Sequence, residues 1–220
     1  MKIALDGPAG AGKSTVAKAI SKKLDIMYLD TGAMYRAVAL HMLDNGIAVE
    51  DIKKVEEALE EIDLQIKYED GMQKMYLKGE DVSLRIRENA VSKAASDFSA
   101  LQPVRVFLVK MQQDTARKND CILDGRDIGT CVLPDADFKF YLTADSSERA
   151  RRRAKELIEK GQNVDVKKIQ EEIELRDYND SHREFSPLRQ AEDAVLVDST
   201  NMNVDEVINF ITGIIEGKKC

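Results

Sequence analysis

The chain has 220 residues, of which 43% are hydrophobic and 33% are charged. This composition supports one large folded domain, or a domain with an insertion, and it excludes disorder as the main state. Forty acidic residues against 33 basic residues give a formal net charge of −7, and only 5% of the residues are aromatic. A protein that grips nucleic acid nonspecifically usually carries a basic face, so we expect no nucleic-acid partner.

The cysteines and the N-terminal segment indicate a protein of a reducing compartment. There is no CxxC pair among the three cysteines, Cys121, Cys131 and Cys220. The two histidines are far apart along the chain, so we expect buried or terminal free thiols and no zinc site. Asp6 ends the first apolar run too early for a signal peptide, and no window approaches the roughly 20 apolar residues of a membrane span. We expect a cytoplasmic monomer without membrane contact.

Short apolar segments alternate with helical patterns along most of the chain. The predicted strands are residues 2–7, 27–30, 121–125, 137–143 and 194–200. The predicted helices are residues 14–24, 32–45, 49–62, 103–118, 146–160, 166–181 and 203–217. This alternation predicts an α/β fold, with a parallel sheet covered by helices on both faces and functional sites at the carboxyl ends of the strands. The predicted core includes Leu29, Phe138, Phe140, Val195 and Leu196.

Residues 62–100 have a different pattern. Apolar and polar residues alternate on both sides of Asp70-Gly71, which favours a hairpin turn, and an Ala- and Ser-rich helical stretch continues to about Ala100. We therefore predict one domain spanning residues 1–220, with a small antiparallel-β and helical insertion at residues 62–100.

A phosphate-binding loop lies between the first predicted strand and the first predicted helix. It matches GxxxxGK[ST] and consists of Gly7, Pro8, Ala9, Gly10, Ala11, Gly12, Lys13, Ser14 and Thr15. Glycines allow backbone N–H groups to converge on phosphate oxygens, Lys13 supplies positive charge, and the Ser14 hydroxyl is a candidate Mg²⁺ ligand. The pattern predicts binding of a nucleoside triphosphate with magnesium. Neither the DxxG nor the [NT]KxD segment of a switch GTPase occurs, and a compact kinase fits the chain length better than a motor does.

Arginines follow the predicted strands in an otherwise acidic protein. Residues 30–36 and 124–130 each begin with an Asp at a strand end and present an Arg after a nearby glycine. The candidate phosphate-binding arginines are Arg36, Arg126, Arg176 and Arg183. Arg176 and Arg183 could instead form structural salt bridges with Asp177 or Asp180, and residues 149–153 could form a solvated helix face. Two sets of arginines suggest a second anion, and a phosphate acceptor needs no general base because its second pKa is near 6.

Taken together, GPAGAGKST, LDTGAMYR, GRDIGT, PDAD and RDYNDSHR followed by SPL resemble the motifs of the bacterial cytidylate kinase family. The resemblance covers residues 3–213. It implies a P-loop nucleoside monophosphate kinase that uses ATP and Mg²⁺ to phosphorylate CMP and dCMP, with an insertion on the monophosphate side.

The resemblance also implies roles for individual residues. Residues 7–15 would bind ATP, Arg36 and Arg126 would hold the acceptor phosphate, and residues 146–165 would form a short lid. The other implied substrate-binding residues are Thr31, Tyr35, Ser96, Arg105, Asp127, Arg176, Asp180 and Arg183. The implied catalytic residues are Lys13, Arg126, Asp127, Arg151 and Arg153. Ser96 and Arg105 look like ordinary helix-surface residues, so their roles rest on the resemblance alone.

Two other functions remain open from the sequence. One is a related small kinase that acts on UMP or on a non-nucleotide acceptor. The other is a nucleotide-dependent binding module that uses the Arg-rich segment 149–160, which the acidic net charge opposes.

Overall fold

The computed structural model describes residues 1–69, 71–159 and 161–217, and the chain divides into two compact units. Unit 1 comprises residues 1–28 and 119–220, and unit 2 comprises residues 29–118. Three positions named above, Asp70, Lys160 and Cys220, lie outside the described residues. Within the described ranges, every helix is too short or too polar to cross a bilayer.

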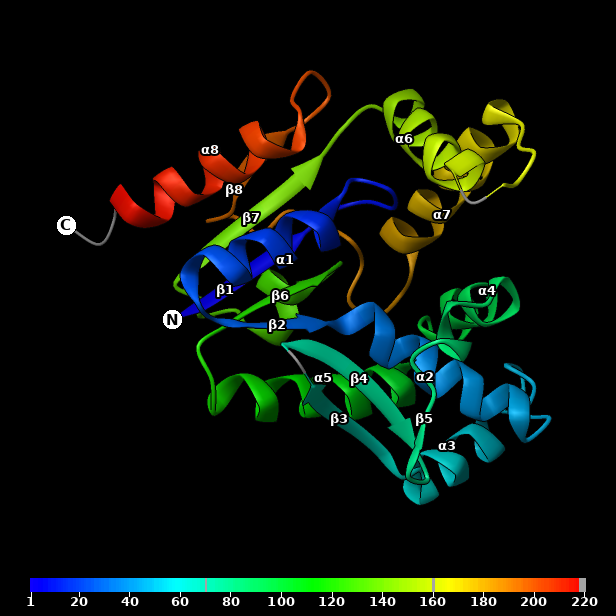
Figure 1. The fold of residues 1–220 in the computed structure, drawn as a ribbon. Coiled ribbons are helices and arrows are strands. Elements are labelled where there is room, and N and C mark those ends of the chain that lie inside the picture. Colours follow the sequence, from blue (N-terminus) through cyan, green and yellow to red (C-terminus); the bar gives the residue numbers. More distant parts are fainter. Residues whose placement is uncertain (70, 160, 218–220) are drawn as a thin grey trace. The chain divides into compact units, whose positions relative to one another are not determined.

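A five-stranded sheet with the order β2-β6-β1-β7-β8 organises unit 1 (Figure 1). Its strands are β1 (Lys2–Asp6), β2 (Met27–Asp30), β6 (Cys121–Gly125), β7 (Phe138–Thr143) and β8 (Val195–Asp198). Strand β1 pairs in parallel with β6 and β7, so that Leu5 lies opposite both Asp124 and Phe140. The carboxyl ends of β1 and β6 are therefore neighbours, and the segments that follow them begin side by side.

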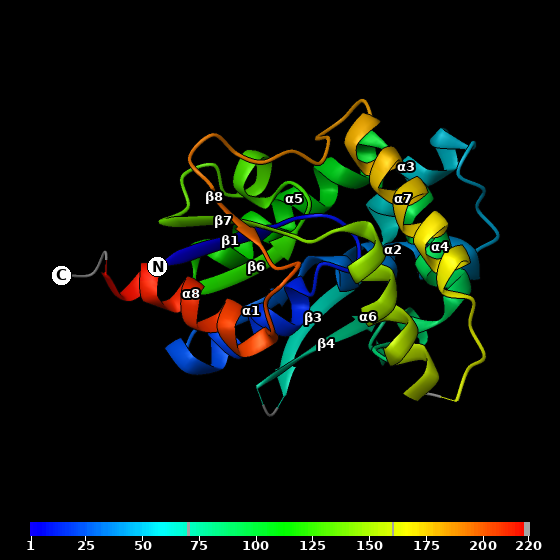
Figure 2. The same ribbon diagram turned by 90° about the horizontal axis from the view of Figure 1, so that it is seen from above.

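Two pairs of helices accompany this sheet. Helices α1 (Lys13–Leu24) and α8 (Val204–Gly217) pack next to each other, and their Ile20 and Ile211 share one buried core with Leu5 and Phe140 of the strands. Helices α6 (Ser146–Glu159) and α7 (Val166–His182) lie side by side (Figure 2). Their contact is a separate small core of Ala150, Ala154, Ile169 and Ile173. The predicted α/β fold with a parallel sheet is confirmed.

Unit 2 combines four helices with an antiparallel sheet. The helices are α2 (Thr31–Asp44), α3 (Ile52–Glu61), α4 (Asn89–Phe98) and α5 (Gln102–Arg117), with a 3₁₀ turn, η1 (Arg85–Arg87). Strands β3 (Leu64–Glu69) and β4 (Met72–Leu77) form the predicted hairpin, in which Leu64 lies opposite Leu77. Helix α2 is buried along most of its length and packs against α4 and β4. The small antiparallel and helical part of the predicted fold is confirmed.

The structure also contains features that the sequence pattern did not predict. A two-residue strand, β5 (Glu80–Asp81), pairs with β4 after a turn at Lys78 and Gly79, both with positive φ. A π-helical turn, η2 (Ile128–Val132), follows β6. The prediction that Leu196 is a core residue is wrong, because Leu196 is 53% exposed. Side chains alternate between the two faces of a strand, and in the edge strand β8 it is Val195 and Val197 that pack into the core.

Candidate active site

The phosphate-binding loop connects β1 to α1 in unit 1. A Cβ atom on Gly7 would lie 1.9 Å from the Leu142 carbonyl oxygen, so only glycine fits where the loop leaves the sheet. Gly12, the N-cap of α1, has a φ of 88°, a left-handed conformation that glycine adopts at little cost. The helix then begins at Lys13, so backbone N–H groups of the loop and the first helical turn are available to an anion.

Lys13 is buried within this loop although it carries a charge. Its Nζ donates a hydrogen bond to the Pro8 carbonyl oxygen at 2.7 Å, and the residue is only 7% exposed. Burial and the nearby Arg126 guanidinium lower the pKa of Lys13 well below its ordinary value, against the opposing effect of Asp124 and other carboxylates. A polyphosphate would supply the negative charge that a buried ammonium group requires.

Helices α6 and α7 hold the phosphate-binding loop by hydrogen bonds to Ala9. The Ala9 N–H donates to Asp177 Oδ1 at 2.9 Å, and Arg149 Nη1 donates to the Ala9 carbonyl oxygen at 2.7 Å. Arg149 also donates to Asp177 Oδ2 at 2.5 Å and through its Nε to the Ala144 carbonyl oxygen at 2.8 Å. Arg149 is therefore a buried support of the loop and not part of a solvated helix face.

Asp124 is a candidate functional residue that the sequence reasoning did not select. It is 5% exposed and is the next-to-last residue of β6, where its Oδ2 accepts a hydrogen bond of 2.7 Å from Ser14 Oγ. Its Oδ1 accepts one of 2.9 Å from the Tyr28 hydroxyl. The hydroxyl of Ser14 and the carboxylate of Asp124 are hard oxygen donors, so the pair fits Mg²⁺. The signal available in the sequence was an Asp that directly follows the apolar residues Cys121, Ile122 and Leu123 of a predicted strand.

Arginines and carboxylates from the β6 end and from α7 form a second cluster in unit 1. Arg126 Nε donates to Asp180 Oδ2 at 2.8 Å, and the side chain of Arg183 lies 3.7 Å from both Asp127 Oδ1 and Asp180 Oδ1. Burial alone would raise the pKa of Asp180, but Arg126, Arg176 and Arg183 hold it below its usual range. Three guanidinium groups share these carboxylates, which leaves the cluster able to accept a further anion.

The remaining substrate-binding candidates lie in unit 2. Asp30 caps α2 by accepting from the Ala33 N–H at 2.8 Å, and it forms an ion pair of 3.2 Å with Arg36. Arg36 Nε is buried and has no hydrogen-bond partner among the described residues, which makes it a candidate donor to a ligand. Thr31 is buried at the beginning of the same helix.

Arg105 and Tyr35 are paired in unit 2. The Arg105 guanidinium carbon lies 5.5 Å from the centre of the Tyr35 ring, and Nη1 donates to the Ser99 carbonyl oxygen at 3.2 Å. Ser96 lies on α4, where its carbonyl oxygen accepts from Ser99 Oγ at 2.8 Å. The expectation from sequence alone that Arg105 is an ordinary surface residue is wrong, because it is only 4% exposed.

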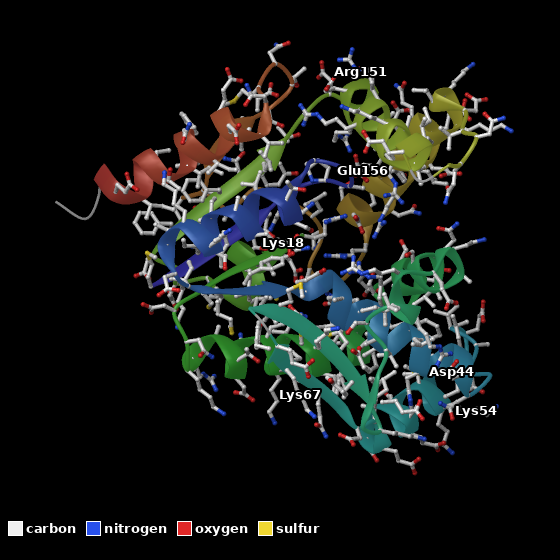
Figure 3. The ribbon with its side chains drawn as sticks, in the orientation of Figure 1. Lys18, Asp44, Lys54, Lys67, Arg151 and Glu156 are labelled. Carbon is white, nitrogen blue, oxygen red and sulfur yellow. The ribbon has the colours of Figure 1, made fainter. Side chains whose placement is uncertain are left out.

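The two arginines proposed for the lid are exposed and paired within α6. Arg151 is paired with Glu148 and has a side chain 77% exposed, and Figure 3 shows it projecting outward from α6. Arg153 forms an ion pair of 3.1 Å with Glu156, and its side chain is 45% exposed. These exposed pairs restrain the arginines only weakly, so both side chains can reorient.

The family model and the curated relatives that match this chain have the same description. The family model described as cytidylate kinase matches residues 3–217. A cytidylate kinase of Caldicellulosiruptor bescii is 52% identical over 211 residues, which cover 96% of this chain and 93% of that protein. One of Lactobacillus johnsonii is 48% identical over 219 residues, covering 100% of this chain and 95% of the relative.

Solved structures share the fold at low sequence identity. A shikimate kinase from Bacteroides thetaiotaomicron superposes with a TM-score of 0.51 at 12% identity, covering 98% of both chains. A gluconokinase from Sinorhizobium meliloti gives a TM-score of 0.52 at 11% identity, covering 99% of this chain and 95% of the other. These similarities support the P-loop kinase fold.

Proposed function

Because the chain belongs to the cytidylate kinase family, we propose that it transfers the γ-phosphoryl group of ATP to CMP or dCMP, giving ADP with CDP or dCDP. The single observation that carries this proposal is the match of the family model to residues 3–217. The buried lysine of the phosphate-binding loop and the arginine clusters supply the groups that this reaction needs.

The donor-binding groups of the proposal lie in unit 1. Residues 7–15 would surround the triphosphate, with backbone N–H groups and Lys13 facing its oxygens. Ser14 and Asp124 would hold Mg²⁺, and Tyr28 would keep the Asp124 carboxylate oriented toward Ser14. When bound, the metal ion would neutralise charge on the β- and γ-phosphates.

The acceptor-binding groups of the proposal are those that the family resemblance implies. Arg36, Arg126 and Arg183 would bind the acceptor phosphate, with Arg176 and Asp180 beside the sugar and phosphate. The base would be recognised by Ser96, Arg105 and Asp127, and Thr31 and Tyr35 would lie near the acceptor. Arg105 is buried against an aromatic ring and so can keep a fixed direction toward its ligand.

Transfer would then need positioning and charge neutralisation more than proton transfer. An oxygen of the acceptor phosphate forms the new bond to the γ-phosphorus while the bond to the leaving oxygen of ADP breaks. The acceptor is largely dianionic at neutral pH, so no side chain has to remove a proton. Arg151 and Arg153, with residues 146–165 as a short lid, would stabilise charge on the transferring group once they reorient.

The test is to measure ADP formation from Mg-ATP with CMP, dCMP, UMP, AMP or GMP, and without an acceptor. We expect ADP with CMP and dCMP only. Equal rates with UMP would support the alternative of a kinase with a different acceptor preference. ADP release that is independent of any acceptor would refute the proposal and indicate an ATPase.

A further inference from the structure

One buried carboxylate connects the phosphate-binding loop to the segment after β6. Asp6 is the last residue of β1 and directly precedes Gly7. Its Oδ1 accepts a hydrogen bond of 2.8 Å from the Ile128 N–H, and its Oδ2 accepts one of 2.7 Å from the Gly129 N–H. Asp6 is 4% exposed, so these contacts are shielded from water. Asp6 is not among the site residues inferred from the sequence.

The two segments approach each other closely at Gly129, where a side chain would be crowded. A Cβ atom there would lie 3.4 Å from Asp6 Oδ2 and 3.2 Å from Lys139 Cδ. Gly129 is the second glycine of GRDIGT, and its close neighbours, not a positive φ, explain why glycine fits at this position. Arg126 and Asp127 immediately precede this contact, so their backbone is fixed relative to the end of β1.

Burying the carboxylate is costly, which argues against a role in packing alone. Burial is the largest influence and raises the pKa of Asp6 to about 6, although the Gly129 and Ile128 amides act in the opposite direction. Asp127 raises this pKa further and Lys13 lowers it. The other charged neighbour, Lys139, forms its own ion pair of 2.8 Å with Asp193. An apolar side chain would avoid this cost, but it would leave two buried N–H groups without an acceptor.

We propose that Asp6 is a positioning residue for phosphoryl transfer, whose ionised carboxylate keeps the Arg126–Asp127 segment in register with the phosphate-binding loop. The proposal rests on the kinase function proposed above. In this proposal the position of Arg126 is fixed by β1, the strand that leads into the loop containing Lys13. The groups proposed to act on the donor and acceptor phosphates are thus held by the same strand.

The test is the substitution Asp6→Asn, which preserves shape but places an NH₂ group against one of the two backbone N–H donors. We expect kcat with CMP to fall by about 10-fold to 100-fold, because small displacements of catalytic groups have effects of this size. The dissociation constant for ATP, measured without acceptor, should stay close to that of the wild type. Amide hydrogen exchange at Ile128 and Gly129 should become faster.

The pH dependence separates positioning from a general structural effect. Protonated Asp6 resembles Asn, so the ratio of wild-type to Asp6→Asn rates should shrink as the pH falls from about 7.5 to about 5. The acceptor phosphate also titrates near pH 6, but it does so equally with both enzymes and cancels in the ratio. A ratio that does not change with pH would contradict the role of the ionised carboxylate.

Two further variants complete the experiment. Asp193→Asn removes a carboxylate that contacts Lys139 and not the two amides, and it should leave kcat unchanged. Gly129→Ala disturbs the contact between Asp6 and the Gly129 N–H by adding a methyl group at Gly129, and it should also lower kcat. This variant tests the proposal even if Asp6→Asn does not fold. Wild-type kcat in both Asp6→Asn and Gly129→Ala would overturn the proposal, as would an equal loss of ATP affinity. A wild-type protein without CMP-dependent ADP formation would instead refute the kinase function.

Discussion

Lys13, which is proposed to bind phosphate, carries a charge that is unfavourable in the folded protein. Burial and Arg126 lower its pKa, which means that the charged form is less favourable in the folded protein than in the unfolded chain. Between the pKa of Lys13 in the folded protein and its ordinary pKa, the side chain therefore binds a proton more tightly in the unfolded chain. Keeping Lys13 charged at neutral pH consequently lowers the stability of the folded protein. Such a cost is expected where an anionic ligand supplies the missing partner.

Replacing Lys13 should therefore separate activity from stability. In Lys13→Met, turnover with CMP should fall by on the order of 10²- to 10³-fold, because a charge that stabilises the transferring phosphoryl group is lost. The temperature of thermal unfolding should rise, because a buried charge is replaced by an apolar chain of similar length. Lys22→Met, at an exposed position of the same helix, is the control and should change neither quantity. Full activity in Lys13→Met would rule out the proposed role.

At the scale of elements, the α6–α7 pair has two different surfaces. Its buried part reaches the phosphate-binding loop through Arg149 and Asp177, while Arg151 and Arg153 are exposed and paired with Glu148 and Glu156. A change in the angle of α6 would therefore be transmitted to Ala9 through hydrogen bonds to both its N–H and its carbonyl oxygen. This linkage gives a physical basis for coupling between the proposed lid and the phosphate-binding loop.

Removing the linkage should weaken both the fold and ATP binding. Arg149→Ala removes the ion pair of Asp177 and leaves the Ala9 carbonyl oxygen without the Arg149 donor, so we expect a loss of about 3–5 kcal/mol in the free energy of unfolding. The affinity for ATP, measured by isothermal titration, should fall as well. Lys155→Ala changes an exposed residue of the same helix and should stay within about 0.5 kcal/mol of the wild type. Unchanged ATP affinity in Arg149→Ala would show that the loop does not depend on α6.

Most helices and strands could be predicted because their patterns are local. Helix α5 has Pro103 in its first turn, and the β3–β4 hairpin has Gly71 at its turn. The burial of Arg105 could not be predicted, because it depends on Tyr35, which lies on another helix far away in sequence. The contact between Asp6 and Gly129 likewise arises only when β1 and β6 pair. The residues that connect elements were thus the ones least visible in the sequence.

At the scale of the whole molecule, the two units contain different parts of the proposed machinery. Unit 1 contains the phosphate-binding loop, Asp124 and the cluster around Asp180, whereas unit 2 contains Arg36, Tyr35 and Arg105. Substitutions of these residues in unit 2 should change the use of the acceptor while leaving the affinity for ATP intact. Arg105 is the most direct test, because its proposed role concerns the base and not a phosphate.

In Arg105→Met, kcat/KM for CMP should fall by about 10-fold to 200-fold, the range associated with about 1.4–3 kcal/mol for a lost charged hydrogen bond. The selectivity for CMP over UMP should decrease, and the dissociation constant for ATP should remain that of the wild type. Arg117→Met is the matched control, because Arg117 lies at the end of the same helix with a side chain 72% exposed. Arg105 is also packed on Tyr35, so unfolding must be measured in parallel to detect a loss of packing. An equal loss of affinity for CMP and ATP would show that Arg105 supports the fold of unit 2 and does not read the base.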